Sequence, residues 1–198
     1  MTTIVELLVE VKAAKNSTGP HETDAVEFRY YGLNQTGKQL LENPGGDLDL
    51  RGISPDVSLR FVLANKTLEW AGDIWDVTFP ANATDALWIF ENQLAKETYQ
   101  QVDPEFHGVK HAQYSGRPTV AVEGHNKRSF IYDYALTVEV HRAGRRYTHR
   151  HDPQIKNGGL RFNPYQMLQY VLLPALLLLV TMLLVVDLIV RFTQQVPG

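Results

Sequence analysis

The sequence contains no cysteine, and its 198 residues show none of the common signatures of a catalytic nucleophile. The absence of cysteine excludes disulfide bonds and thiol chemistry, and it agrees with a reducing compartment. A G-x-S-x-G elbow and an H-E-x-x-H zinc motif are also absent. We therefore predict no catalytic residue, no cofactor and no bound metal. An enzyme whose site carries no recognisable motif is the open alternative.

Charge is absent from residues 166–186, "QMLQYVLLPALLLLVTMLLVV". As a helix these residues would extend about 31 Å, which matches the ~30 Å hydrocarbon core of a bilayer. The run has no polar face to turn towards water, so a buried helix of a globular domain is disfavoured. The sequence therefore predicts a transmembrane helix over 166–190 and a short tail over 191–198.

A signal peptide is also lacking, since "TTIVELLVEVKAAK" has no basic region and places acids among its apolar residues. The expected protein is thus tail-anchored and crosses the membrane once. Residues 1–140 carry 12 basic and 20 acidic side chains, a net charge of −8, whereas 141–165 is basic. The positive-inside rule places the N-terminal domain in the cytoplasm and the C-terminus on the far side. Four glycosylation sequons, at Asn16, Asn34, Asn65 and Asn82, would matter only in a secretory lumen.

The basic segment 141–165 is expected to hold the last strands and a collar that contacts lipid head groups. Its basic residues are Arg142, Arg145, Arg146, Arg150, Lys156 and Arg161. We expect no nucleic-acid binding, because the acidic domain would repel phosphates.

Asp187 stands near the end of the apolar run. Counting back in steps of four and three gives a seam with Gln169 at its other end, comprising Gln169, Leu173, Leu176, Val180, Leu183 and Asp187. Polar side chains at membrane depth usually face protein, so the seam predicts helix self-association. The alternative is that Asp187 pairs with Arg191 at the head groups.

Period-two alternation dominates residues 1–140. In "FIYDYALTVEV" (130–140), aromatic and aliphatic residues alternate with polar or small ones. Further strands are predicted at 5–11, 26–30, 57–63, 74–79, 86–90 and 119–123, with one moderate helix at 92–101 and a hairpin partner after 140. The fold class is therefore all-β, an immunoglobulin-like antiparallel β-sandwich followed by the C-terminal helix. A barrel is the less favoured alternative.

Motifs that resemble ligand sites are incomplete. "GLNQTGKQ" (32–39) ends in glutamine where a phosphate loop needs serine or threonine, and it favours a hairpin turn. Asp47 and Asp49 could suggest calcium, but a solvated rim is favoured. His149 and His151 lie two apart near His141, which leaves a metal or a pH-sensitive contact open.

The large aromatic residues are Trp70, Trp75, Phe79, Trp88 and Phe90. We interpret them as core, with an aromatic ligand groove as the alternative. The function that fits these features is non-enzymatic: a tail-anchored sandwich that binds a partner or signal while its helix self-associates, as in a membrane-disrupting effector of a bacterial defence system. The alternative is a single-helix accessory subunit that stabilises a large respiratory or photosynthetic membrane complex.

Overall fold

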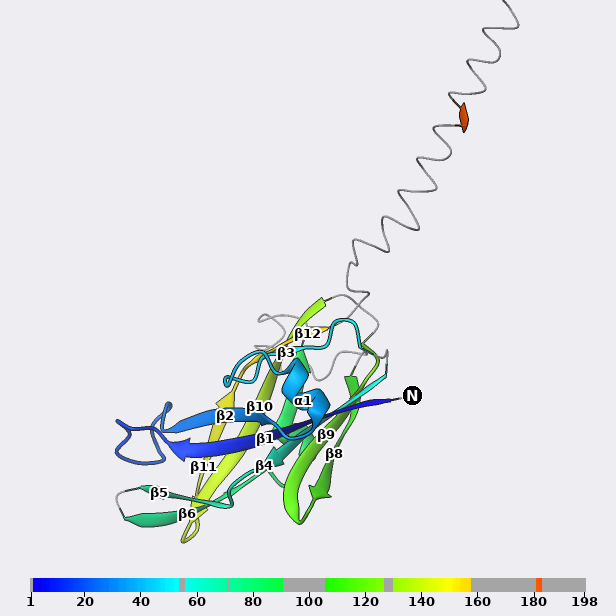
Figure 1. Cartoon of the computed structure of the whole chain (residues 1–198). Coiled ribbons are helices and arrows are strands. Elements are labelled where there is room, and N and C mark those ends of the chain that lie inside the picture. Colours follow the sequence, from blue (N-terminus) through cyan, green and yellow to red (C-terminus); the bar gives the residue numbers. More distant parts are fainter. Residues whose placement is uncertain are drawn as a thin grey trace, which may run out of the picture. The chain divides into compact units, whose positions relative to one another are not determined.

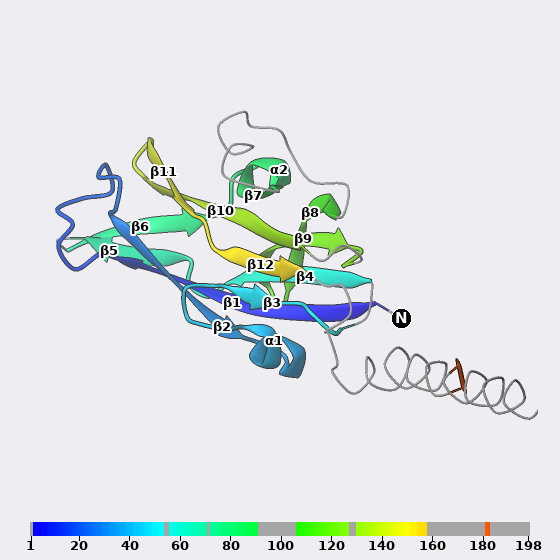
Figure 2. The same cartoon turned by 90° about the horizontal axis from the view of Figure 1, so that it is seen from above.

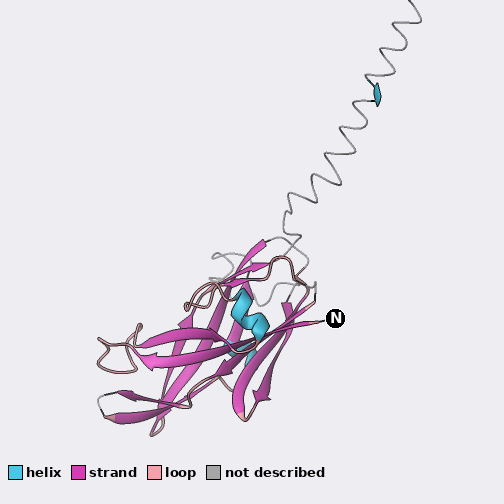
Figure 3. Cartoon of the chain, in the orientation of Figure 1, coloured by secondary structure: helices cyan, strands magenta, loops and turns pink. Residues whose placement is uncertain are grey.

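The computed structural model describes residues 2–53, 56–70, 72–90, 106–126, 130–157 and 181–182. The chain divides into two compact units, Met1–Gly159 and Leu160–Gly198, and of the second unit only the helical pair Thr181 and Met182 is described. The first unit is an all-β, sandwich-like domain of two sheets, and strands dominate its drawing in Figure 3. The predicted all-β class is confirmed.

The first sheet has five strands, seen side by side in Figures 1 and 2. Their order is β2 (Val26–Gly32), β1 (Thr3–Ala13), β4 (Val57–Leu63), β9 (Arg117–Gly124) and β8 (Phe106–Tyr114). β1 and β4 run parallel, with Val5 opposite Leu59, while the other neighbours are antiparallel.

The second sheet is built around the long strand β10 (Phe130–Arg142). One edge of β10 pairs with β11 (Arg145–His151) and β12 (Gln154–Asn157), and the other with β7 (Leu87–Phe90) and β6 (Asp73–Thr78). The outer strands are β3 (Leu48–Asp49) and β5 (Thr67–Trp70). β3 runs parallel to β12. The prediction of wholly antiparallel sheets is therefore wrong at two ladders, because alternation fixes which face is buried and not which strand lies alongside.

The core lies between the two sheets. Val5, Leu7, Val9 and Val11 of β1 are all buried, as are the alternate residues of β10 from Tyr132 to Val140. The ring of Phe61 lies 5.3 Å from that of Tyr134, so side chains of the two sheets touch directly. Alternating apolar residues thus form one face of each sheet, as the sequence predicts.

Most predicted strands are confirmed within a few residues. They are β1, β2, β4, β6, β7, β9 and β10, and the hairpin partner expected after residue 140 is β11, which pairs with β10. Strands β3, β5 and β8 were not predicted, and the helix expected at 92–101 lies outside the described residues. β10 continues past residue 140 and pairs with β11 and β12, so the segment up to 157 is part of the same sheet.

Two short helices complete the described part of the domain, α1 (Gln35–Leu40) and α2 (Ala83–Ala86). The side chain of Asn34 caps α1 by accepting from the Gly37 amide at 2.7 Å. A helix rather than a hairpin turn therefore follows β2, and the predicted turn at "GLNQTGKQ" is wrong. The cause is the capping asparagine, which favours helix initiation.

The prediction of a single-pass membrane protein needs correction. Within the described residues no helix is long and apolar enough to cross a membrane. The six residues of α1 extend about 9 Å, far less than a bilayer's ~30 Å. The predicted helix 166–190 lies outside the described residues except for Thr181 and Met182, and its whole association seam and the tail 191–198 lie outside them.

Candidate functional site

Strand β8 forms one edge of the first sheet, at the right of the domain in Figure 1. Within the part of the chain that the structure describes, it pairs only with β9, and no backbone hydrogen bond joins it to another segment. The opposite edge strand, β2, differs because the Tyr30 amide donates to the Pro44 carbonyl at 2.9 Å. Most residues of β8 are exposed or half-buried. An exposed edge of this kind can pair with another chain.

The turn between β8 and β9 sets the register of that edge. Ser115 and Gly116 both have positive φ, 49° and 74°, as a two-residue hairpin turn requires. Tyr114 therefore faces Arg117, and Gln113 faces Pro118. In such a hairpin the pair beside the turn is hydrogen-bonded, and the bonding alternates from there. Gln113 and Pro118 therefore form a pair without backbone hydrogen bonds between them, which suits Pro118 because it has no amide hydrogen.

This alternation directs the backbone groups of His111 and Gln113 away from β9. Their N–H and C=O groups are the ones that a further strand could bind. Towards the start of β8 the ladder is broken by a bulge between His107 and Lys110, where Gly108 has a φ of +68°. Bulges commonly interrupt edge pairing. The regular edge available for pairing therefore spans residues 110–114.

The side chains of β8 and of the turn that follows it are basic. Residues 106–118 contain Lys110 and Arg117 together with two histidines and no aspartate or glutamate. The Lys110 ammonium lies 3.5 Å from the Glu123 carboxylate, and its side chain is 60% exposed. A pair this long and exposed is weak, so Lys110 can meet a second carboxylate.

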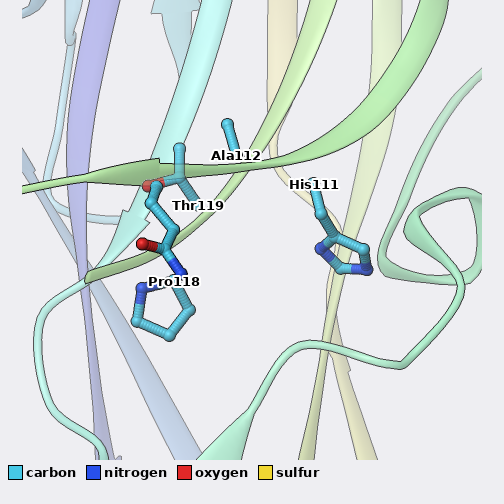
Figure 4. A pocket seen from close by; sticks show the side chains of 5 residues that line it. His111, Ala112, Pro118 and Thr119 are labelled. Atoms are coloured by element: carbon cyan, nitrogen blue, oxygen red, sulfur yellow. The ribbon is translucent and has the colours of Figure 1, made fainter. Parts of the chain in front are cut away.

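A shallow hollow of about 370 Å³ lies at this hairpin. Its lining residues are His111, Ala112, Gln113, Pro118 and Thr119. The imidazole Nε2 of His111 is 3.1 Å from the Ala81 carbonyl, which anchors the ring between β8 and the loop before α2. Figure 4 shows Ala112 and His111 directed to opposite sides of the ribbon. The hollow provides space for a small side chain beside the exposed backbone.

A polar cluster between the sheets involves Tyr30, Tyr134 and His151. The Tyr30 hydroxyl is 3.3 Å from His151 Nδ1, and the Tyr134 hydroxyl donates to the Gly46 carbonyl at 2.7 Å. Burial raises the pKa of both phenols well above the ordinary value. Neither phenol ionises near neutral pH, so the cluster joins the sheets as neutral hydrogen-bonding groups.

The predicted histidine set is divided by the structure. His149 and His151 share the core-facing side of β11, opposite Val138 and Leu136, whereas His141 lies 4.0 Å from Asp76 on the other face of the sheet. Within the described part of the chain, no group of three or more His, Cys, Asp or Glu residues is placed to hold a metal ion. Of the two carboxylates considered for calcium, Asp49 binds Arg51 at 2.7 Å and Asp47 accepts from the Gln154 amide.

The predicted basic collar lies on β10, β11 and β12, where most members have partners within the domain. Arg142 pairs with Asp73, Arg146 lies 3.5 Å from Glu139, and Lys156 lies 2.6 Å from Glu42. The guanidinium of Arg150 lies 4.6 Å from the Trp88 ring centroid. Arg161 lies outside the described residues. Binding of these residues to lipid head groups stays a prediction.

The aromatic residues mainly form the core, as predicted. Trp70 and Trp75 are 5% and 7% exposed and pack edge to face, with 6.3 Å between their ring centroids. Phe79 joins the same core. Trp88 is half-buried and pairs through its strand with Ala135, on the outward face of the second sheet. The interpretation as buried core therefore holds for the first three residues and for Phe90, which is 3% exposed, and not for Trp88.

The residues of the β8 edge were missed by the sequence analysis. "FHGVKHAQY" shows no alternation, because both sides of an edge strand are exposed and a bulge shifts its register. One signal was available: Ser115-Gly116 is a typical turn dipeptide between Tyr114 and the predicted strand at 119–123. Reading it as a hairpin would have placed a strand before residue 115.

Comparisons with known proteins give little further information. No family model matches the chain, and no curated protein matches it. A solved structure of the inclusion body protein PixA from Burkholderia cenocepacia J2315 is similar over 80% of this chain and 97% of that one, with 10% sequence identity and a TM-score of 0.40. A likeness at this level carries no information about activity or partners.

Proposed function

We propose that this protein is a non-enzymatic binding module whose sandwich-like domain captures an extended segment of a partner protein along β8. The observation that supports the proposal is the outward direction of the His111 and Gln113 backbone groups on an edge strand. Main-chain hydrogen bonds supply affinity in this mode of recognition, and side-chain pockets supply specificity. The hollow at the β8–β9 hairpin is suited to the second role.

We also propose that the domain is immunoglobulin-like. The support for this classification is the pair of facing sheets and the large share of strands. The two parallel ladders, β1 with β4 and β12 with β3, are departures from that architecture. The two functions that depend on a membrane-spanning helix are not proposed.

The test is amide hydrogen exchange on the full chain, with and without a nine-residue peptide in which valine and threonine alternate. Binding along β8 should slow exchange at His111 and Gln113, whose amides point outward. Amides of Lys110 and Ala112 are already bonded to β9 and should change little. Protection confined to another strand, or no protection at saturating peptide, would overturn the proposal.

A pair of variants at Gln113 separates the backbone from the side chain. Gln113→Pro removes the outward N–H but leaves the bonds between β8 and β9, a placement that proline tolerates on edge strands. Gln113→Ala keeps the N–H and removes only the side chain. We expect the proline variant alone to lose peptide binding, while both keep the thermal unfolding temperature of the parent within a few degrees. Equal binding by both variants would contradict strand addition.

A further inference from the structure

We infer that the segment accepted by β8 is acidic, with carboxylates at alternate positions, and belongs to a protein other than this one. The inference rests on the proposed function and adds the chemistry of the partner. It starts from the contrast between the β8–β9 hairpin and the rest of the domain. Residues 106–118 carry two cations and no carboxylate, and the carboxylate of Glu123 on β9 lies 3.5 Å from Lys110, whereas residues 1–159 carry 17 basic and 21 acidic side chains, a net charge of −4.

The position of Lys110 determines which face of the added strand bears carboxylates. Lys110 is opposite Ala121 and close to Glu123, so it lies on the outward face of the sheet with Ala112. Residues on one face of a strand recur at every second position. An incoming strand with glutamate on that face therefore brings one carboxylate beside Lys110 and the next beside the small Ala112.

Arg117 extends the attraction to the turn. It is exposed, and among the described residues no salt bridge holds it. Its counterpart across the ladder is Tyr114, the last residue of β8. Lys110 would lie on the strand next to the added segment, where opposite charges are stabilising. Arg117 is one strand further in on the same face, so it adds a longer-range attraction for an acidic segment.

The opposite face of the added strand meets a different surface. His111 and Pro118 lie on the side away from Lys110. Small or apolar residues fit that side, because a carboxylate there would stand away from both cations. The expected segment consequently alternates acidic with small apolar residues.

A second copy of this chain is disfavoured as the occupant. Pairing β8 with β8 would bring the same cations of two molecules onto one sheet, and like charges on adjacent strands repel. Lysine on an edge strand is a common device against such self-pairing. The positive charge of β8 thus disfavours pairing with a second copy of the chain and favours pairing with an acidic segment.

The test is a peptide series measured by fluorescence anisotropy on the full chain. Three labelled nine-residue peptides alternate valine with glutamate, glutamine or lysine. We expect the glutamate peptide to bind about ten-fold more tightly than the glutamine peptide at low salt, and the lysine peptide to bind most weakly. The preference should shrink in 0.5 M NaCl, because salt screens exposed charges.

Charge variants locate the preference. Lys110→Glu should abolish or reverse the preference for glutamate while binding of the glutamine peptide stays unchanged. Lys15→Glu, an exposed lysine in the loop after β1, is the matched control and should leave the preference intact. Sedimentation of the parent without peptide, at the same concentrations, should show no dimer that depends on β8. Such a dimer would be recognised because the Gln113→Pro variant would be monomeric.

The outcomes distinguish the two proposals. If all three peptides bind equally and Gln113→Pro still abolishes binding, strand addition stands and the acidic partner is overturned. If no peptide binds, or if Gln113→Pro binds like the parent, strand addition itself fails. A dimer that Gln113→Pro dissolves would identify the occupant as a second copy.

Discussion

The imidazole of His151 lies parallel to the ring of Phe28, with 5.3 Å between the ring centroids and 12° between the planes. Phe28 belongs to β2 of the first sheet, and His151 ends β11 of the second. The same imidazole is hydrogen-bonded to Tyr30. One histidine therefore joins the two sheets along their side, and its state of charge affects how they pack.

Acid should destabilise the domain through His149 and His151. Burial lowers the pKa of both imidazoles. This effect outweighs the hydrogen bond that the His149 ring donates to the Pro20 carbonyl, and the carboxylates of Asp152 and Asp47 near His151, which raise the pKa. The unfolded chain takes up these protons near pH 6.5, and the folded chain does so only at lower pH. Their contribution to stability is therefore complete above about pH 6.5 and is lost as the pH falls below it.

Urea unfolding at about pH 7.5 and pH 5.5 measures this effect as the fall in the free energy of unfolding. The control is the double variant His149→Gln with His151→Gln, in which the fall should be smaller. A fall of the same size in parent and double variant would assign the acid sensitivity to carboxylates instead.

Tyr134→Phe should lower the free energy of unfolding by about 1–3 kcal/mol, because it leaves the buried Gly46 carbonyl without its donor. Tyr31→Phe is the matched control. Its hydroxyl also makes a hydrogen bond, to Glu10 at 3.0 Å, but the residue is 44% exposed and water can replace the contact. We expect a change within about 0.5 kcal/mol for the control in denaturant titrations. Equal losses of unfolding free energy in the two variants would mean that the buried hydrogen bond to Gly46 stabilises the domain no more than the exposed one to Glu10.

Gly37→Ala should destabilise the domain by about 2 kcal/mol or more, although alanine ordinarily favours helices. A Cβ at this position would lie 2.3 Å from the Glu6 carbonyl oxygen on β1. That oxygen is backbone and accepts from the Leu33 amide, so it cannot move without disturbing the sheet. Lys38→Ala, exposed on the same helix, should change thermal stability little. A stabilised Gly37→Ala protein would contradict the close packing of α1 on β1.

Asn65→Ala should lower the free energy of unfolding by about 1–3 kcal/mol. The reason is that the Asn65 side chain bonds backbone groups of β1, as a neighbouring strand would. Its Oδ1 accepts from the Val11 amide at 3.0 Å, and its Nδ2 donates to the Val11 and Thr67 carbonyls at 2.8 Å each. Asn65→Asp should be at least as harmful, because a carboxylate would face two carbonyl oxygens. Asn16→Ala, at an exposed loop position, is the control for denaturant unfolding. An aspartate variant as stable as the parent would refute the assigned amide orientation.

The asparagines of the four sequons have different roles in the structure. Asn34 and Asn82 cap the two helices, and Asn65 binds the backbone of β1. Of the four, Asn16 alone is exposed in a loop with no such capping role among the described residues. The tripeptides at the other three positions therefore have a structural explanation.

Alternating side chains predicted the core and most strands correctly. "VSLRFVL" at 57–63 is β4, and "FIYDYALTVEV" lies within β10, because burying one face of a strand requires an apolar residue at every second position. The same pattern could not reveal that β1 runs parallel to β4, or that β11 and β12 share one edge of β10. Those pairings depend on contacts between segments far apart in the sequence.

The amino-acid sequence by itself determined the all-β class, the buried face of each alternating strand and the absence of thiol chemistry. Only the tertiary structure decided that β8 is an exposed edge, which backbone groups on it point outward, and that Arg142, Arg146 and Lys156 bind carboxylates of the same domain. The reason is physical: burial leaves a local periodic record in the chain, whereas an unpaired edge is defined by the neighbour it lacks. The basic character of that edge becomes meaningful once its backbone is known to face outward.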